Sequence, residues 1–451
     1  MYAKALIASA LLASSALGAA SADAVAACQQ LYTTYPTLTV WDPLGSYGAE
    51  TVSNVDKYFP VNRPACVLFP FTAEEVSYAV RQLNKYPNTQ FALKSGGHNF
   101  NAGVSSTNGG VLISFNEKLS SVTRPASGES FEVGPGARWG NVYEIAAKTN
   151  YVVVGGRLAN IGVAGLTRSR AVVLFGAICG LGQRGHRRCN RTSHSNLWWA
   201  LRGGGKRFDI VTKFTLQAHD LGDNGQVWGG IRSYSADKRQ EVFKAMSTFI
   251  RVYPDAKAAV IPTFTVGSPD AMGSNPTVYF FYDGSAPPTS AFSGLEDVEP
   301  ILDTTATTTY VNLTNQAGED NAYGLSMGPR MNTFPSMEPE KASRLLEAHF
   351  QLYQSQVSNI SSRNIDIQMG RFTPQPLSVR IARASTDRGG NALGLDPANG
   401  DRIWVENDLI WINPICNDAC PAYLREIADQ AMLNFTNSFE GEKPTNYHSA
   451  I

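Results

Sequence analysis

The sequence predicts an α+β or α/β fold of two domains, and three features support this prediction. The 451-residue chain is 43% hydrophobic and 17% charged, which is ordinary for a globular protein long enough for more than one domain. Between residues 61 and 222, short apolar strands alternate with helices. From residue 223 to about 410, longer helical stretches alternate with strand-like runs, which indicates a second domain built around its own sheet.

Residues 1–22 predict a secretory signal peptide. A short basic start precedes the small, apolar run from Ala5 to Ala20, and Ala20-Ser21-Ala22 offers a cleavage site. The run is too short and too rich in alanine to predict a membrane anchor, and no later run is long enough to cross a bilayer. The 38 basic and 38 acidic residues balance, so the charge predicts neither a nucleic-acid partner nor a membrane partner. We therefore expect a secreted protein, with residues 23–60 as a lead-in segment.

The cysteines and the glycosylation triplets agree with secretion. An oxidising compartment permits disulfides, and we predict a bond between Cys28 and Cys66 that fastens the N-terminal segment to the first strand. Cys416 and Cys420 are close enough in sequence to close a small loop. No spacing of cysteines and histidines predicts a metal site. Four Asn-x-Ser/Thr triplets are candidate glycosylation sites, at Asn190, Asn312, Asn359 and Asn434.

The apolar pattern predicts the elements of both domains in order. A buried strand over residues 65–69 precedes Thr72-Ala73-Glu74-Glu75, a capping box that begins a helix reaching about Asn84. Further strands of the first domain are predicted at 91–94, 110–115 and 130–133, with a helix at 139–148. In the second domain we expect helices at 238–252 and 340–357 and strands at 258–266, 277–282 and 365–370.

A glycine-rich loop, Ser95-Gly96-Gly97-His98-Asn99, follows the predicted strand that ends at Lys94. Successive glycines let backbone N–H groups converge on a phosphate without a clash of Cβ atoms. A histidine on such a loop would lie beside the rest of a bound dinucleotide. An isolated loop histidine is more often exposed or hydrogen-bonded locally, so the flanking sequence decides between the two interpretations.

Five motifs follow one another along the chain, at residues 91–103, 110–114, 133–137, 155–167 and 196–205. Together they resemble the FAD-linked oxidases of the vanillyl-alcohol oxidase and berberine-bridge-enzyme type. The resemblance is strong from about residue 66 to residue 216 and looser to about residue 414. It implies an α+β fold, with a two-subdomain PCMH-type FAD-binding domain over residues 61–222 and a substrate domain over residues 223–410, in which helices flank an antiparallel sheet.

The resemblance implies that His98 bonds covalently to the FAD ring. Some relatives have a second tether, a cysteine in a Gly-x-Cys segment, but Leu158 stands at that position here, so we expect a single tether. The cofactor-binding residues that the resemblance implies are Lys94, Ser95, Gly96, Gly97, His98, Asn99, Gly103, Gly162, Gly165, Ile210 and Val211.

The activity that the resemblance implies is hydride transfer from a small organic substrate to the flavin, with O2 as the acceptor. The substrate class is a secondary metabolite, an alcohol or a sugar, and fold-level analogy does not choose among them. Tyr282 and Tyr323 are candidate pocket residues, although most such tyrosines are packing residues. The pattern does not identify the catalytic base.

Three departures from the family pattern lead to a rival hypothesis. Residues 168–189 are rich in arginine and do not match the expected aromatic segment, yet codons for Val172 to Cys179, read one base later, can encode it. We therefore suspect that residues 168–189 are translated out of frame. Asp209 stands where a glycine is usual, and residues 411–451 form a truncated version of a segment expected to return to the flavin domain. The rival hypothesis is an inactive secreted glycoprotein of the same fold.

Residues Gly180–Gly185 match the Gly-x-Gly-x-x-Gly pattern of Rossmann dehydrogenases, but the sequence around them does not fit that fold. Such a motif needs a helix directly after it and an acidic residue about 20 positions later. The following residues, His186 to Asn190, are poor helix formers. We therefore do not expect NAD(P) binding.

Overall fold

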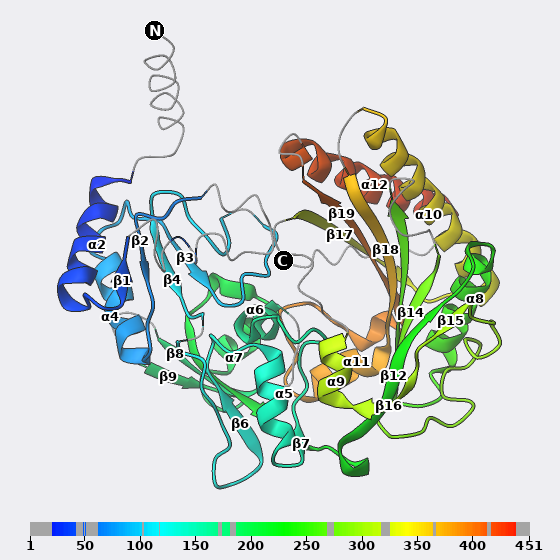
Figure 1. Ribbon diagram of the computed structural model, residues 1–451, viewed down its shortest axis with the longest axis horizontal. Helices are drawn as coiled ribbons and strands as arrows, with labels where there is room; N and C mark the ends of the chain where they lie inside the picture. Colours follow the sequence, from blue (N-terminus) through cyan, green and yellow to red (C-terminus); the bar gives the residue numbers. More distant parts are fainter. Residues whose placement is uncertain are drawn as a thin grey trace.

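The computed structural model describes most of the chain as two lobes that face each other (Figure 1). The described residues are 20–41, 48, 50, 62–101, 103–116, 118–169, 174–180, 186–267, 275–316, 325–363, 367–412 and 416–438. The chain passes from the first lobe to the second between β11 (His219–Asp220) and β12 (Gln226–Ser233). Most of the predicted signal peptide, residues 1–19, lies outside the described residues. Within the described parts, no helix has the length and apolar character needed to cross a membrane.

The first lobe begins with a small sheet covered by two helices. Among the described residues the strand order is β1 (Thr39–Val40), β2 (Cys66–Leu68), β4 (Val111–Ser114) and β3 (Phe91–Lys94), with β4 parallel to both of its neighbours. The helices α2 (Ala22–Thr34) and α4 (Ala73–Leu83) share a buried apolar cluster with this sheet. The lead-in segment therefore supplies a helix and an edge strand of this subdomain.

Two features of this subdomain match the sequence prediction residue by residue: the capping box of α4 and the disulfide between α2 and β2. The Thr72 hydroxyl accepts the backbone N–H of Glu75 at 3.3 Å, and the Glu75 carboxylate accepts the backbone N–H of Thr72 at 3.0 Å, which is a complete capping box. The predicted disulfide is also present, because Cys28 on α2 is bonded to Cys66 on β2.

The second part of the first lobe is an antiparallel sheet with its own core. The strand order is β5 (Val122–Thr123), β6 (Ser130–Val133), β10 (Val211–Gln217), β8 (Leu174–Gly180) and β9 (His186–Cys189). The helices α5 (Trp139–Ala147), α6 (Val163–Ser169) and α7 (Ser195–Leu201) contribute to the same lobe, and β7 (Tyr151–Val152) pairs with β11. Trp139, Phe131 and Phe214 are among the fully buried side chains of this core.

The segment suspected of being out of frame contributes strands to this sheet. Its residues 174–180 pair with β10, and its residues 186–189 pair antiparallel with β8. Residues 170–173 and 181–185 lie outside the described residues. An antiparallel strand, rather than a helix, is the next element after β8, so the described backbone does not have the strand–helix arrangement of a Rossmann motif.

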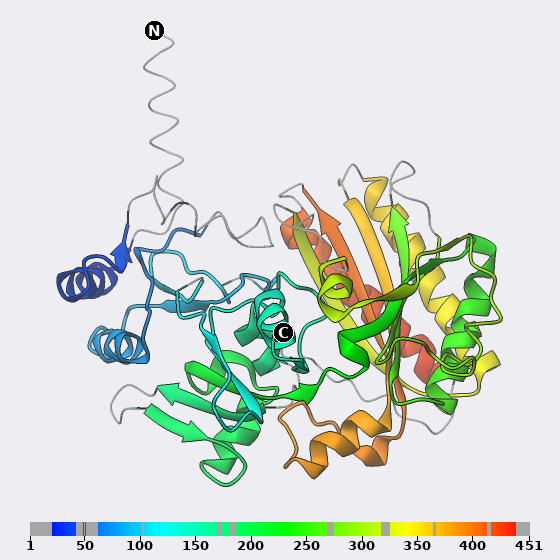
Figure 2. The same ribbon diagram turned by 60° about the horizontal axis from the view of Figure 1, so that its bottom comes forward.

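The second lobe is built on a large antiparallel sheet. Among the described residues its order is β15 (Leu302–Asp303), β12, β14 (Thr277–Tyr282), β13 (Ala258–Gly267), β18 (Ile367–Leu377), β19 (Arg402–Trp411) and β17 (Ser326–Pro335), with β16 (Ala306–Thr309) also paired to β12. Three long helices cover the face turned away from the first lobe (Figures 1 and 2): α8 (Arg239–Val252), α10 (Pro339–Ser361) and α12 (Cys416–Ser438).

Shorter elements complete the molecule. The helices α9 (Tyr310–Gln316) and α11 (Val379–Asp387) lie on the side of the second lobe nearer the first lobe (Figure 2). Among the described residues, 3₁₀ turns lie at Gly205–Arg207, Asp223–Gly225, Ala236–Lys238 and Pro397–Asn399.

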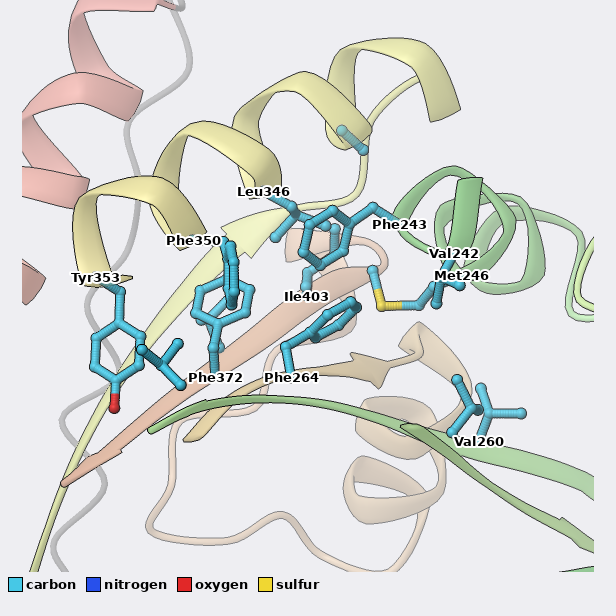
Figure 3. Close-up of a cluster of buried hydrophobic side chains, with 14 of the residues drawn as sticks. Val242, Phe243, Met246, Val260, Phe264, Leu346, Phe350, Tyr353, Phe372 and Ile403 are labelled. Atoms are coloured by element: carbon cyan, nitrogen blue, oxygen red, sulfur yellow. The ribbon is translucent and has the colours of Figure 1, made fainter. Parts of the chain in front are cut away.

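Aromatic side chains fill the core between the large sheet and its helices (Figure 3). Phe243 of α8 packs on Phe264 of β13, with ring centroids 4.3 Å apart, and Phe350 of α10 packs edge-on against Phe372 of β18. All four side chains are buried. This core fixes which face of the sheet remains turned towards the first lobe.

The described part of the C-terminal segment is a helix of the second lobe. Residues 416–438 form α12, whose apolar residues Leu424, Ile427 and Phe435 join the core of the second lobe. The expected pairing of Cys416 with Cys420 is present as a disulfide, which lies in the first turns of this helix. Residues 439–451 lie outside the described residues.

Candidate flavin and substrate site

The glycine-rich loop starts from a strand end that is held by a buried ion pair. The Lys94 ammonium donates to the backbone carbonyl of Glu50 at 2.6 Å and lies 2.9 Å from the Glu50 carboxylate. The Ser114 hydroxyl on the neighbouring strand donates to the same carboxylate at 2.7 Å. Burial lowers the pKa of Lys94, and Glu50 opposes that shift. Lys94 therefore has a partner within the protein. Its contact with Glu50 holds the strand end from which the glycine-rich loop begins.

The backbone of Gly96 in the loop packs directly against the backbone of Gly162, which belongs to the motif at residues 155–167. A Cβ atom on Gly96 would lie 2.4 Å from the backbone nitrogen of Gly162, and a Cβ on Gly162 would lie 2.3 Å from that of Gly96. The Ser95 hydroxyl donates to the carbonyl of Pro135 at 2.6 Å, which adds a third segment to the contact. Only glycine allows this approach of the two backbones.

Backbone hydrogen bonds join the other two motifs of the site. The N–H of Trp139 donates to the carbonyl of Ile161 at 3.0 Å, and the N–H of Gly140 donates to that of Ala159 at 2.8 Å. The N–H of Val163 donates to the carbonyl of Ala137 at 2.9 Å. The motifs around residues 133–140 and 155–163 therefore form one continuous wall beside the glycine-rich loop.

His98 lies half-buried on this loop, with its ring edge-on to Phe100 at a centroid distance of 5.2 Å. Gly97 and Gly103 both have φ near +71°, a conformation that L side chains rarely adopt. The Asn99 side chain accepts the backbone N–H of Asn101 at 2.9 Å, which shapes the loop after His98. These residues form a cradle of exposed backbone around the histidine.

Buried polar atoms beside the cradle fit an oxygen-rich ligand. The hydroxyls of Ser105 and Ser106 are buried, and neither has a hydrogen-bond partner among the described residues. A buried hydroxyl without a partner is costly, and bound phosphate or ribityl oxygens would satisfy it. Together with the glycine contacts, these atoms show that the residues present fit FAD.

The remaining predicted cofactor residues lie around the same wall. Gly165 is exposed on α6, with nothing within 4 Å of a Cβ built on it. Ile210 and Val211 are buried, and each belongs to the core of a different part of the first lobe. Asp209 precedes them, and its carboxylate accepts the backbone N–H of Ile210 at 2.7 Å. Leu158 is half-buried in the 155–162 segment.

The second lobe turns one face of its sheet towards this wall, and we call it the cleft face. Along β13 and β14, residues of even number are buried against the helices, whereas residues of odd number are mostly half-exposed. On β19, Val405 and Leu409 belong to the helix-side core, so Trp404, Glu406 and Asp408 point to the cleft face.

Polar side chains of the cleft face connect it to the flavin wall. Arg157 of the first lobe donates to the Gln375 side-chain oxygen at 3.3 Å, and the Gln375 amide donates to the Glu406 carboxylate at 3.2 Å. Farther along the strands, Arg371 forms an ion pair with Asp408 at 3.0 Å. Burial, followed by the nearby Glu406, raises the pKa of Asp408 to about 8, against the opposing effects of Arg371 and Arg157.

Sequence reasoning missed these four residues of the cleft face. The alternation in Ile403-Trp404-Val405-Glu406-Asn407-Asp408-Leu409 contains the signal, because a strand would place its two acidic residues on one face. The tyrosines that were considered do not replace them. Tyr282 lies on the helix side, where its hydroxyl donates to Asp255 at 2.9 Å, and Tyr323 lies outside the described residues.

Three of the four candidate glycosylation sites are accessible. Asn312, Asn359 and Asn434 are exposed. The Asn190 side chain is half-buried, and its oxygen accepts the backbone N–H groups of Thr192 and Ser193 at 2.9 and 2.7 Å.

Comparison with known proteins agrees with this geometry. A family model described as an FAD binding domain matches residues 64–182. An uncharacterized FAD-linked oxidoreductase of Arthroderma benhamiae is 27% identical over 414 residues, which cover 85% of this chain and 78% of that protein. The FAD-dependent monooxygenase drtC of Aspergillus calidoustus is 26% identical, with 87% and 76% coverage.

Solved structures share the fold at low identity. The 6-hydroxy-D-nicotine oxidase of Arthrobacter nicotinovorans superposes with a TM-score of 0.69 at 16% identity, covering 91% of this chain and 88% of that one. Berberine bridge enzyme gives the same TM-score at 16% identity, with 96% and 88% coverage. The chain is therefore an FAD-linked oxidoreductase: it carries an FAD binding domain, is homologous to fungal FAD-linked oxidoreductases and monooxygenases, and has the fold of the vanillyl-alcohol oxidase and berberine bridge enzyme family.

Proposed function

We propose that this oxidoreductase holds FAD covalently through His98 alone and oxidises a small organic alcohol, with O2 as the electron acceptor. The observation that carries the proposal is the chain of contacts from Arg157 through Gln375 to Glu406. It brings a carboxylate of the cleft face to the flavin wall, on which the loop of His98 also packs. A substrate bound between the two lobes would therefore contact both.

The residues of this chain have separable roles in the proposed reaction. Bound FAD would supply the hydride acceptor, and its reoxidation by O2 would release hydrogen peroxide. Glu406 would accept the proton of the substrate hydroxyl while the carbon bearing that hydroxyl loses its hydride. The Gln375 amide, itself held by Arg157, would keep the Glu406 carboxylate in position.

The single tether follows from the identity of two residues. His98 offers a ring nitrogen for a covalent bond, and Leu158 offers no nucleophile at the place of a second tether. In this proposal the glycine cradle and the hydroxyls of Ser105 and Ser106 hold the rest of FAD by non-covalent contacts.

We further propose that the protein is secreted, glycosylated and active on a secondary metabolite, an alcohol or a sugar. Residues 1–22 have the composition of a signal peptide. The Cys28–Cys66 disulfide is typical of an oxidising compartment, and three asparagines of the glycosylation triplets are exposed. No described feature favours the inactive glycoprotein that was the rival hypothesis.

The covalent tether is tested by replacing His98. The wild-type protein should keep yellow flavin fluorescence on a denaturing gel, and His98→Ala should lose it, whereas Leu158→Ala should retain it. His194→Ala is a matched control, because His194 is an exposed histidine of the same lobe. Flavin that is released from the wild-type protein by acid precipitation alone would contradict the tether.

The role of Glu406 is tested by Glu406→Gln, which keeps the shape of the side chain and removes its basicity. Loss of a general base should lower kcat by about 10²- to 10⁴-fold. Flavin content should not change, because Glu406 lies in the other lobe. Glu241→Gln, on the exposed side of α8, is the control. Peroxide release at the wild-type rate from Glu406→Gln would exclude this residue as the base.

A further inference from the structure

One ion pair lies among the apolar side chains and threonines of the cleft face. Half-exposed apolar side chains at the odd positions of β13 and β14 and on β17 to β19 line this face. Phe281 of β14 meets Tyr310 of α9 edge-on at 5.9 Å, which agrees with its direction towards the first lobe. The apolar side chains that line the face are Ile261, Tyr279, Phe281, Met331, Met369 and Trp404.

Arg371 and Asp408 form this pair, and their side chains differ in exposure to solvent. Their strands place them opposite each other, and the guanidinium contacts both the Asp408 carboxylate at 3.0 Å and the Met327 sulfur at 3.4 Å. The Asp408 side chain is 4% exposed, whereas the Arg371 side chain is 35% exposed. Asp408 therefore lies beneath Arg371, and the outer edge of the guanidinium faces the cleft.

Two buried atoms of this pair have no hydrogen-bond partner among the described residues. They are the second carboxylate oxygen of Asp408 and the Nε of Arg371. A buried ion pair that is incompletely satisfied is a poor source of stability, so its presence calls for another explanation. A ligand group at the guanidinium would supply such an explanation.

The charges around Asp408 leave Arg371 with a net positive charge at neutral pH. The charged and titratable groups that face Asp408 are Arg371 on β18, Glu406 on β19 and Arg157 from the first lobe, and on the helix side the Tyr353 hydroxyl donates to its backbone carbonyl. Burial raises the pKa of the Asp408 carboxyl to about 8, so near pH 7 its negative charge only partly offsets the positive charge of Arg371. Glu406 is engaged by Gln375 and lies nearer the flavin wall.

We propose that Arg371, positioned by Asp408, binds a carboxylate of the substrate, so that the substrate is an apolar alcohol bearing an acid group. A guanidinium is suited to bidentate binding of a carboxylate, and the apolar side chains of the cleft face would contact the rest of such a substrate. This inference rests on the proposed function, because it names the substrate class of the same cleft. It adds Arg371 as a specificity residue and Asp408 as a positioning residue.

The strand register sets the spacing that the substrate must match. Glu406 lies opposite Thr373, two residues along β18 from Arg371. At about 3.3 Å per residue, the acid group would bind about 7 Å along the strand from the carboxylate that accepts the proton. A ring that carries a hydroxymethyl group and a carboxylate in para positions has about this length, so 4-(hydroxymethyl)benzoate is a suitable probe.

Binding without turnover is the first test, with 4-methylbenzoate compared against the neutral 4-methylbenzamide by calorimetry on the holoenzyme at pH 7. We expect the wild type to bind the acid at least tenfold more tightly. Arg371→Met should weaken binding of the acid by about 10- to 100-fold and leave the amide unchanged. Arg371→Lys keeps the positive charge but lacks the paired N–H donors of the guanidinium, so its loss of affinity for the acid should be intermediate.

The chain offers a matched control in a second cross-strand arginine–aspartate pair. Arg232 of β12 contacts Asp303 of β15 at 2.9 Å, on the opposite face of the sheet. Arg232→Met should leave both affinities unchanged. Equal binding of acid and amide by the wild type, or wild-type affinity for the acid in both Arg371 variants, would overturn the inference.

The pH dependence tests the role of Asp408. As the pH rises through about 8, Asp408 becomes ionised and neutralises Arg371, so affinity for 4-methylbenzoate should fall above that pH. Asp408→Asn cannot ionise, and its affinity for the acid should stay constant from pH 6 to pH 9. A pH-independent wild type, or an unchanged fall in Asp408→Asn, would exclude this positioning role.

Turnover separates this inference from the proposed function. We expect peroxide release with 4-(hydroxymethyl)benzoate at a KM at least tenfold lower than with its methyl ester. Equal KM values for acid and ester would refute carboxylate recognition and leave alcohol oxidation standing. Selective binding of the acid without turnover of any alcohol would support the Arg371 site and refute the proposed oxidation.

Discussion

Asp209 places a buried carboxylate next to two residues, Ile210 and Val211, that the sequence assigns to the cofactor site. It is 5% exposed, and its carboxylate accepts the backbone N–H of Ile210 at 2.7 Å. That N–H belongs to a residue that the sequence assigns to the cofactor site. The carboxylate therefore occupies a donor and adds negative charge beside a wall that fits a phosphate-bearing ligand.

We expect Asp209→Gly to raise FAD occupancy of the purified protein, because it frees the Ile210 N–H and removes the charge. Asp209→Asn separates the two effects, since it keeps an acceptor for the N–H but carries no charge. The ratio of flavin absorbance to protein absorbance, measured after expression with excess riboflavin, reports the result. Occupancy that is equal in all three proteins would show that Asp209 does not limit binding.

At the scale of elements, the sequence predicted those helices and loops that are formed by contacts between residues close together in the chain. The capping box at Thr72 and Glu75 and the apolar spacing of Val76, Ala79 and Leu83 specify α4 without help from the rest of the chain. The glycine-rich loop was also found from sequence, because glycines that allow close backbone approach leave a clear pattern. In the structure these glycines meet where the wall of the flavin site is formed.

Elements that depend on distant partners were harder to predict. Strand β8 comes from a segment whose composition does not suit a sheet core, and its pairing with β10 and β9 places it. The ion pair of Arg371 and Asp408 joins residues 37 positions apart, and it exists because β18 and β19 pair in one register. A single sequence gives the alternation along each strand, but not which strands become neighbours.

At the scale of the whole molecule, a loop of the second lobe around Gly390 and Leu393 also joins the two lobes. The backbone N–H of Ala392 donates to the carbonyl of Arg202 at 2.9 Å, and the Arg202 guanidinium donates to the carbonyl of Gly390. Leu393 sits against Gly203, where a Cβ atom would lie 2.5 Å from its Cγ. This loop of the second lobe therefore docks on the helix α7 region of the first lobe. Its docking fixes how the cleft face meets the flavin wall.

Gly203→Ala tests whether this docking matters for catalysis. The new methyl group would displace Leu393, and alanine is also strained at the φ of +111° found there. We expect kcat to fall by about tenfold or more with flavin content nearly unchanged, because the flavin wall is intact while the cleft face shifts. Limited proteolysis should cut the 388–400 loop faster than in the wild type.

Gly205→Ala is the matched control, since Gly205 also has a positive φ, of +61°, but nothing lies within 4 Å of a Cβ there. It carries the backbone strain without the clash and should keep most of the activity. If both variants lose activity equally, backbone strain in the 203–205 turn explains the loss, and docking of the 388–400 loop does not. If only Gly203→Ala loses activity while its flavin content is unchanged, turnover requires the contact between the two lobes as well as a bound flavin.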